Sequence, residues 1–182
     1  MDAETRKYIS AIAQRIVDVY DISIPVNIDT VVHKLGGKIK VCSINESLYS
    51  ETLRKTGDAE FTISISPSQC QNPKRRTFAI AQKLGHLFLH MGFNTDPDLW
   101  NQQNRVVHQD SYTIEQIYQA NEFAESLLMP ETEYKETLDR FAENGYIHMS
   151  DVANYFKVSI SLAVSRGKSL GYFTENIKKV TY

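Results

Sequence analysis

The chain has 182 residues, of which 42% are hydrophobic and 23% charged, so it can bury a sizeable core as one compact domain, or as one domain with a small cap. No apolar run approaches the roughly 20 residues that span a bilayer, and residues 1–10 lack the order of a signal peptide, so a cytoplasmic protein without membrane contact is expected. The net charge of −2 argues against wholesale nucleic-acid binding. Cys42 and Cys70 form no Cys-x-x-Cys pair, so both cysteines are expected to be reduced thiols.

The first forty residues predict two helices. Apolar residues recur at helical spacing between Ala3 and Tyr20, and Asp2 stands where an N-cap residue is expected. A second helix should open at Asp29 and end at Gly36-Gly37, because glycine readily adopts the left-handed conformation that ends helices. Both helices have an apolar face, so both should pack on the core.

The next segments predict a small antiparallel sheet packed on these helices. Residues 38–44 and 60–66 alternate between apolar and polar side chains, as strands with one buried face do. A short strand within residues 50–57 would lead into a turn at Thr56-Gly57-Asp58. Residues 69–73 should then form a polar loop that leads into the next helix.

The stretch from Arg75 to His90, RRTFAIAQKLGHLFLH, predicts a helix with a wide apolar face that runs from about Lys74 to Met91. Glycine inside a helix costs up to about 1 kcal/mol relative to alanine, so Gly85 indicates a close neighbour. In active zinc proteases such a helix carries His-Glu-x-x-His, in which two imidazoles bind the metal and the glutamate activates water. Here the five residues read Gln82-Lys83-Leu84-Gly85-His86, so only the second imidazole is present.

Three segments follow this helix. Residues 94–109 contain a proline and six Asn or Gln side chains, which predicts a long loop over the site. Residues 112–129 predict a long helix that Pro130 ends, and residues 131–144 predict another.

The C-terminal segment has the order of elements found in a helix-turn-helix. Residues 151–156 and 160–169 predict two short helices, and a basic tail follows. Residues 157–182 hold five basic side chains and one acidic, a charge of +4 that leaves −6 for the remainder. Because the second helix is not rich in Lys or Arg, a packing cap is the favoured interpretation. The alternative is DNA binding through residues 150–182, with Arg166 and Lys168 as contacts.

Two blocks of sequence resemble the ImmA/IrrE family of metallopeptidase-like proteins. Residues 78–90, FAIAQKLGHLFLH, are similar to its FTIAHELGHLLLH signature, and residues 120–130, ANEFAESLLMP, are similar to its EANxFAAxLLMP segment. The blocks lie in the family's order and at its approximate separation. The resemblance implies an α+β fold, with a zincin-like domain over residues 1–145 and a small helical, helix-turn-helix-like cap over residues 146–182.

The same resemblance assigns former roles in the metal site. The first metal imidazole maps onto Gln82, the general base onto Lys83, the second imidazole onto His86 and the third ligand, a carboxylate, onto Gln119. Amide oxygens bind zinc poorly, and a lysine ammonium has no lone pair with which to activate water. We therefore expect no bound cofactor and no intact catalytic residue. Lys83 is instead a candidate to hydrogen-bond Gln119 or to pair with Glu115.

The resemblance also implies a function. Members of the family cleave or antagonise helix-turn-helix repressors that govern mobile elements, phage induction or stress responses. We expect a catalytically degenerate regulator that binds a protein partner, a transcriptional repressor, in the former substrate groove. The alternative is an active zinc-dependent endopeptidase that uses His86 with His90 or Glu115.

Zincins commonly seat an extended substrate as an added strand on a sheet edge beside the metal helix. The strand at residues 60–66 is therefore a candidate peptide-docking edge, through Phe61, Thr62, Ile63 and Ser64. The other interpretation is a strand that only covers the core.

Overall fold

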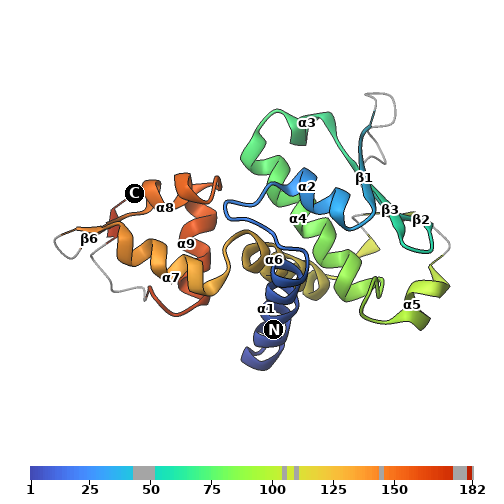
Figure 1. The fold of residues 1–182 in the computed structure, drawn as a ribbon, viewed down its shortest axis with the longest axis horizontal. Helices are drawn as coiled ribbons and strands as arrows, with labels where there is room; N and C mark the ends of the chain where they lie inside the picture. Colours follow the sequence, from blue (N-terminus) through green and yellow to red (C-terminus); the bar gives the residue numbers. More distant parts are fainter. Residues whose placement is uncertain (43–51, 104–105, 109–110, 144–145, 174–179, 182) are drawn as a thin grey trace.

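The computed structural model describes residues 1–42, 52–103, 106–108, 111–143, 146–173 and 180–181. The fold is α+β, as predicted: a small sheet lies beside packed helices, and further helices form a second group (Figure 1). The helices are α1 (Ala3–Val19), α2 (Ile28–Lys34), α3 (Pro67–Cys70), α4 (Pro73–His90), α5 (Pro97–Gln102), α6 (Ile114–Leu128), α7 (Glu131–Arg140), α8 (Met149–Tyr155) and α9 (Ile160–Ser169). The strands are β1 (Gly37–Val41), β2 (Thr52–Gly57), β3 (Glu60–Ile65), β4 (Val106–His108), β5 (Ala142–Glu143), β6 (Tyr146–His148) and β7 (Val180–Thr181).

Capping side chains fix where the long helices begin. Asp2 accepts a hydrogen bond from the Thr5 backbone at 2.7 Å at the start of α1. Asn72 accepts from two backbone N–H groups at the start of α4, and Thr113 forms a reciprocal capping box at the start of α6. The predicted helices at these places are confirmed. The helix predicted over residues 131–144 ends earlier, at Arg140, because the chain turns there into β5.

The larger sheet has the strand order β1-β3-β2-β4. β2 and β3 form an antiparallel hairpin, with its turn close to the predicted Gly57. β1 pairs in parallel with the other side of β3, so the sheet is mixed, not purely antiparallel as predicted. The hairpin places β2 on one side of β3, which leaves the other side for β1, and β1 runs in the same direction as β3. The predicted strand ends at residues 43–44 and 50–51 lie outside the described residues.

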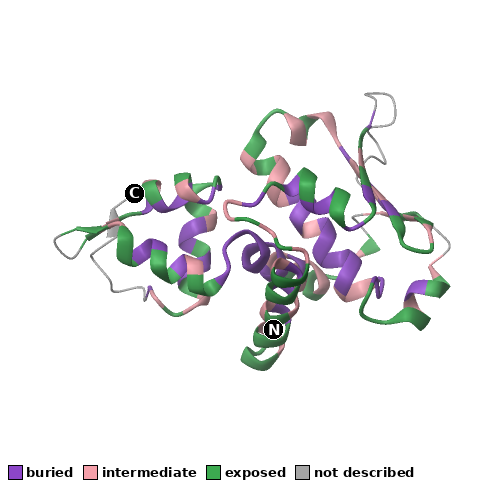
Figure 2. Cartoon of the chain, in the orientation of Figure 1, coloured by how far each residue is buried: buried purple, intermediate pink, exposed green. Residues whose placement is uncertain are grey.

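The sheet and helices α4 and α6 each contribute a buried face to the core (Figure 2). Side chains on one face of β3, those of Phe61, Ile63 and Ile65, have no exposed surface. A Cβ atom added at Gly85 would lie 2.9 Å from both the Cα and the carbonyl oxygen of Ala120. The absence of a side chain at Gly85 therefore lets α4 and α6 approach closely, as predicted.

The long loop predicted over residues 94–109 contains regular structure. Asp96 caps α5 and Pro97 occupies its first turn, two start signals that override the polar composition. Trp100 is buried, and its indole Nε1 donates to the Asp58 carbonyl. Val106–His108 forms β4 against β2, while Gln109 lies outside the described residues. The short helix α3 also overlaps the first two residues of the polar loop predicted at residues 69–73.

Helices α7, α8 and α9 group together at one end of the molecule (Figure 1). The buried Tyr134 hydroxyl of α7 donates to the Ala163 carbonyl of α9 at 2.5 Å. The two predicted C-terminal helices are thus present, and α7 packs with them; the predicted domain boundary at residue 145 stays a prediction. Cys42 and Cys70 are free thiols, as expected. Within the described residues, no helix is both long enough and apolar enough to cross a membrane.

Candidate functional site

The predicted site residues gather where α4 packs on α6. Gln82, Lys83 and His86 belong to α4, and Gln119 belongs to α6. The close approach of the helices at Gly85 holds the two rows of side chains within hydrogen-bonding distance of each other.

Gln82, which maps onto the first metal ligand, is hydrogen-bonded to a neighbouring side-chain amide. The Gln82 side-chain N–H donates to the Asn121 side-chain oxygen at 2.7 Å, across the helix interface. Asn121 belongs to the second family-like block, but the sequence analysis gave it no role in the site.

His86 lies at the end of a series of hydrogen bonds that runs through His90 to Gln119. His90 Nε2 lies 2.9 Å from the Gln119 side-chain oxygen, and His90 Nδ1 lies 3.0 Å from His86 Nδ1. Because the amide oxygen can only accept, His90 donates from Nε2 and accepts at Nδ1, so His86 donates from Nδ1. His86 Nε2 then carries no proton. This atom is buried and has no hydrogen-bond partner among the described residues.

Burial keeps both imidazoles neutral. The pKa of His86 falls to about 3, mainly because the side chain is buried and further because His90 and Lys83 lie nearby. The pKa of His90 is also lowered by burial, although its bond to Gln119 opposes the shift. The pair therefore behaves as two neutral rings at physiological pH.

An aromatic ring covers the buried imidazole. The Tyr112 ring stacks on His86, with centroids 3.5 Å apart and an interplanar angle of 15°. Burial raises the pKa of the Tyr112 hydroxyl, which has no hydrogen-bond partner within the described part of the chain. Sequence reasoning missed Tyr112, because it precedes the α6 cap and belongs to no motif.

Lys83, at the general-base position, is only 1% exposed. Of its two predicted partners, Gln119 is bonded to His90 and Glu115 is exposed in the first turn of α6. The predicted Lys83 pairing stays a prediction, which the thermal stability of Lys83→Ala would check. The structure brings His86 and His90 together, as the alternative metal set requires. Within the described residues, no three His, Cys, Asp or Glu side chains are grouped so that they could hold a metal ion.

The predicted peptide-docking edge at Phe61, Thr62, Ile63 and Ser64 is wrong. β3 is hydrogen-bonded to β1 on one side and to β2 on the other, so it has no free edge. Alternation of apolar residues shows which face of a strand is buried, but not which strands lie beside it.

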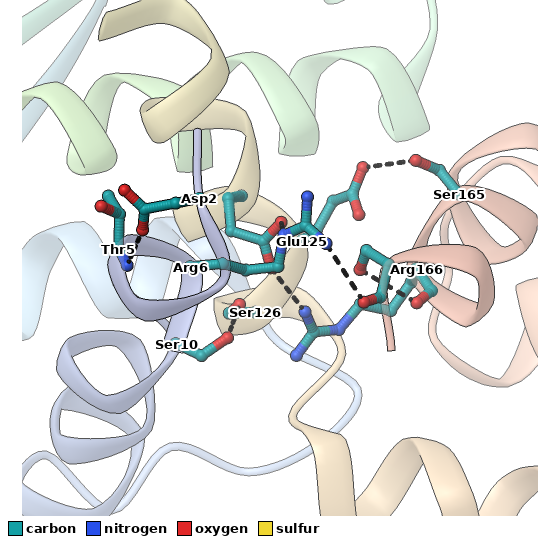
Figure 3. Close-up of polar contacts among 10 residues, drawn as sticks. Asp2, Thr5, Arg6, Ser10, Glu125, Ser126, Ser165 and Arg166 are labelled. Atoms are coloured by element: carbon teal, nitrogen blue, oxygen red, sulfur yellow. Dashed lines mark hydrogen bonds and ion pairs between the residues drawn. The ribbon is translucent and has the colours of Figure 1, made fainter. Parts of the chain in front are cut away.

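The predicted DNA contact at Arg166 is also excluded, because this side chain is only 1% exposed. Its Nη1 donates to Glu122 at 3.1 Å and its Nε to the Met129 carbonyl at 3.0 Å. Arg6 of α1 lies 3.3 Å from the other Glu122 oxygen. Figure 3 shows these contacts, which join α1, α6 and α9. Arg166 is thus a structural residue.

A second buried carboxyl lies in the same region. Glu125 accepts a hydrogen bond from the Ser165 hydroxyl at 2.8 Å, while its other oxygen has no partner among the described residues (Figure 3). Burial raises the pKa of Glu125 to about 7, an effect that the Ser165 bond partly opposes. The sequence analysis singled out neither Glu122 nor Glu125, because their partners Arg166 and Ser165 lie in a different helix and cannot be read from the motif.

Comparison with known proteins supports the sequence resemblance. More than half of the chain, residues 39–167, matches the family of IrrE N-terminal-like domains. A solved structure described as a Mycobacterium tuberculosis transcriptional regulator is similar in fold, with 15% sequence identity and a TM-score of 0.58. The similarity covers 97% of this chain and 52% of that one, so this chain spans about half the length of the regulator. Among curated proteins, none matches the sequence significantly.

Proposed function

The chain belongs to the family of IrrE N-terminal-like domains, and on that premise we propose that it is a regulatory protein that has lost metallopeptidase chemistry. It acts by binding a protein partner, not by cleaving one. The partner class is a helix-turn-helix transcriptional repressor, and the contact surface is the former substrate groove beside α4.

One observation carries this proposal: the former ligand positions are bonded to other side chains of the protein. Gln82 is bonded to Asn121 and Gln119 to His90, and both are neutral amides. Zinc sites in proteins use thiolate, imidazole and carboxylate donors, of which only His86 remains at these positions. The residues therefore do not fit zinc. Lys83 adds a cationic side chain where the cation would lie, which further disfavours the metal.

The alternative of an active endopeptidase is less well supported. His86 and His90 share a hydrogen bond through their Nδ1 atoms, and Glu115 is exposed. The neighbour that completes the set is the amide of Gln119, which supplies no negative charge. A general base for water is missing as well, because Lys83 occupies that position.

Metal analysis tests the loss of chemistry. The purified chain, produced with zinc in the medium, is expected to hold far less than one zinc ion per molecule, and His86→Ala should not change that content. A zinc content near one per chain that disappears in His86→Ala would show that the donors still bind metal, and would refute the proposal.

The mode of action needs a second experiment. The chain would be mixed with purified helix-turn-helix repressors from the source cell, and binding would be followed by calorimetry. Mass spectrometry would then report whether each repressor stays intact. A stoichiometric complex with an uncleaved repressor is the expected result. Repressor cleavage that a chelator abolishes would instead support the endopeptidase.

A further inference from the structure

A cavity of about 420 Å³ lies between the N-terminal halves of α4 and α9. This volume is within the range of small-molecule sites in proteins. The cavity also reaches Gln82, the position at which the family carries its first metal imidazole. Among the described residues, no Asp or Glu lines it.

Two cationic side chains in the wall have no counter-ion among the described residues. Within that part of the chain, Lys74 donates to a neutral amide, the Asn154 side-chain oxygen, at 3.4 Å. Arg75 is exposed, and no carboxylate of the described residues lies within ion-pair distance of it. Their neighbour Arg76 behaves differently, because both of its terminal nitrogens bind Asp29, at 2.6 and 2.7 Å. The cavity therefore has a positive wall that no carboxylate of the described residues neutralises.

The opposite wall combines hydroxyl groups with apolar surface. The Ser159 and Ser161 hydroxyl oxygens of α9 lie 3.0 Å apart. Only one of these two groups donates in that bond, so the other keeps a proton for a ligand. Phe78 and Leu162 are half-buried in the lining and present apolar surface. Ser165 does not contribute a donor, because its hydroxyl donates to Glu125.

We infer that this cavity binds a small organic anion. An apolar body would pack on Phe78 and Leu162, and an oxyanion, either phosphate or carboxylate, would bind Lys74 and Arg75. The inference goes beyond the proposed function, since it requires neither a metal nor the protein partner. Bound anions would contact the former metal helix next to Gln82.

Calorimetric titration of the full chain at constant ionic strength tests this site. The probes are phenyl phosphate, benzoate and inorganic phosphate, with chloride as the balancing salt. Saturable binding of phenyl phosphate or of benzoate is expected, and comparison of the two identifies the preferred oxyanion. Arg75→Gln and Lys74→Gln should each weaken the better probe about tenfold, because each removes a charge-assisted contact. Arg15→Gln, which removes an exposed cation from α1, is the matched control and should bind as the parent chain does.

Three outcomes would overturn the inference. One is the absence of saturation with either aromatic probe. Another is equal weakening by Arg15→Gln, which would indicate general charge attraction. The third is equal binding of inorganic phosphate and phenyl phosphate, because the apolar wall would then contribute nothing. Circular dichroism of the variants confirms that each is folded.

Discussion

At the scale of single residues, the candidate site is defined by the partners of its polar side chains. The identities of Gln82, Lys83 and Gln119 can be read from the sequence, and the proposed loss of zinc chemistry rests on them. Their partners cannot be read in the same way. The bond between Gln82 and Asn121 joins positions 39 residues apart, and it depends on how closely two helices approach. Local sequence contains no information on that distance.

Arg166 provides the clearest test at this scale. Arg166→Met should lower the free energy of unfolding by about 3–5 kcal/mol, because it leaves the buried Glu122 carboxylate without its inner partner. Lys168→Met is the matched control: Lys168 is exposed on the same helix, so its loss should cost well under about 1 kcal/mol. Urea denaturation measures both. Adding Glu122→Met to Arg166→Met should recover part of the loss. If Arg166→Met costs no more stability than Lys168→Met, the network is unimportant for stability.

At the scale of elements, helices were easier to predict than strand neighbours. The beginnings of α1, α4 and α6 are determined by caps and apolar periodicity, both of which lie within a few residues of each helix. The place of β3 in the middle of the sheet depends on β1 and β2, which meet it from different parts of the chain. Alternation along β3 predicted its buried face correctly. The same pattern could not show that both edges of the strand are occupied.

The contact between α4 and α6 yields a prediction for Gly85→Ala. Alanine improves helix propensity by about 1 kcal/mol, but its Cβ would lie 2.9 Å from Ala120 backbone atoms and would force the helices apart. The variant should be less stable by about 1–3 kcal/mol in urea denaturation. Ala11→Gly, at an exposed position of α1, measures the propensity contribution without a packing change. A Gly85→Ala protein more stable than the parent would contradict the proposed close packing.

At the scale of the whole molecule, the chain has the fold of its family, and our proposal is that only the groups that bind metal have been lost. The paired sequence blocks predicted the α+β fold because they contain packing residues, such as Gly85, that the architecture requires. If only the donors are lost, the combined variant Gln82→His, Lys83→Glu, Gln119→Glu should bind zinc near one ion per chain. Metal analysis after dialysis checks this, with Gln82→His alone as the control that should stay nearly free of zinc. A folded triple variant that binds no zinc would show that the scaffold around the site has changed too.

The pH dependence of stability should reflect buried groups that act in opposite directions, above all His86 and Glu125. His86 has a folded pKa of about 3, below its ordinary value of 6.5, so the unfolded chain takes up a proton first and stability falls as the pH drops below about 6.5. Glu125 has a folded pKa of about 7, above its ordinary value of 4.5, so the folded chain takes up a proton first and stability rises as the pH falls from about 7 to 4.5. The parent chain should therefore show a weak net dependence between pH 7 and 5. On acidification, urea denaturation should reveal a loss of up to about 1 kcal/mol per pH unit in Glu125→Gln, because Glu125 no longer offsets the effect of His86 and of His90, whose pKa burial also lowers. On the same acidification, His86→Phe should gain stability relative to the parent chain, because its unfolded state no longer takes up a proton at position 86. Parallel curves for the parent and both variants would mean that neither group titrates as its burial requires.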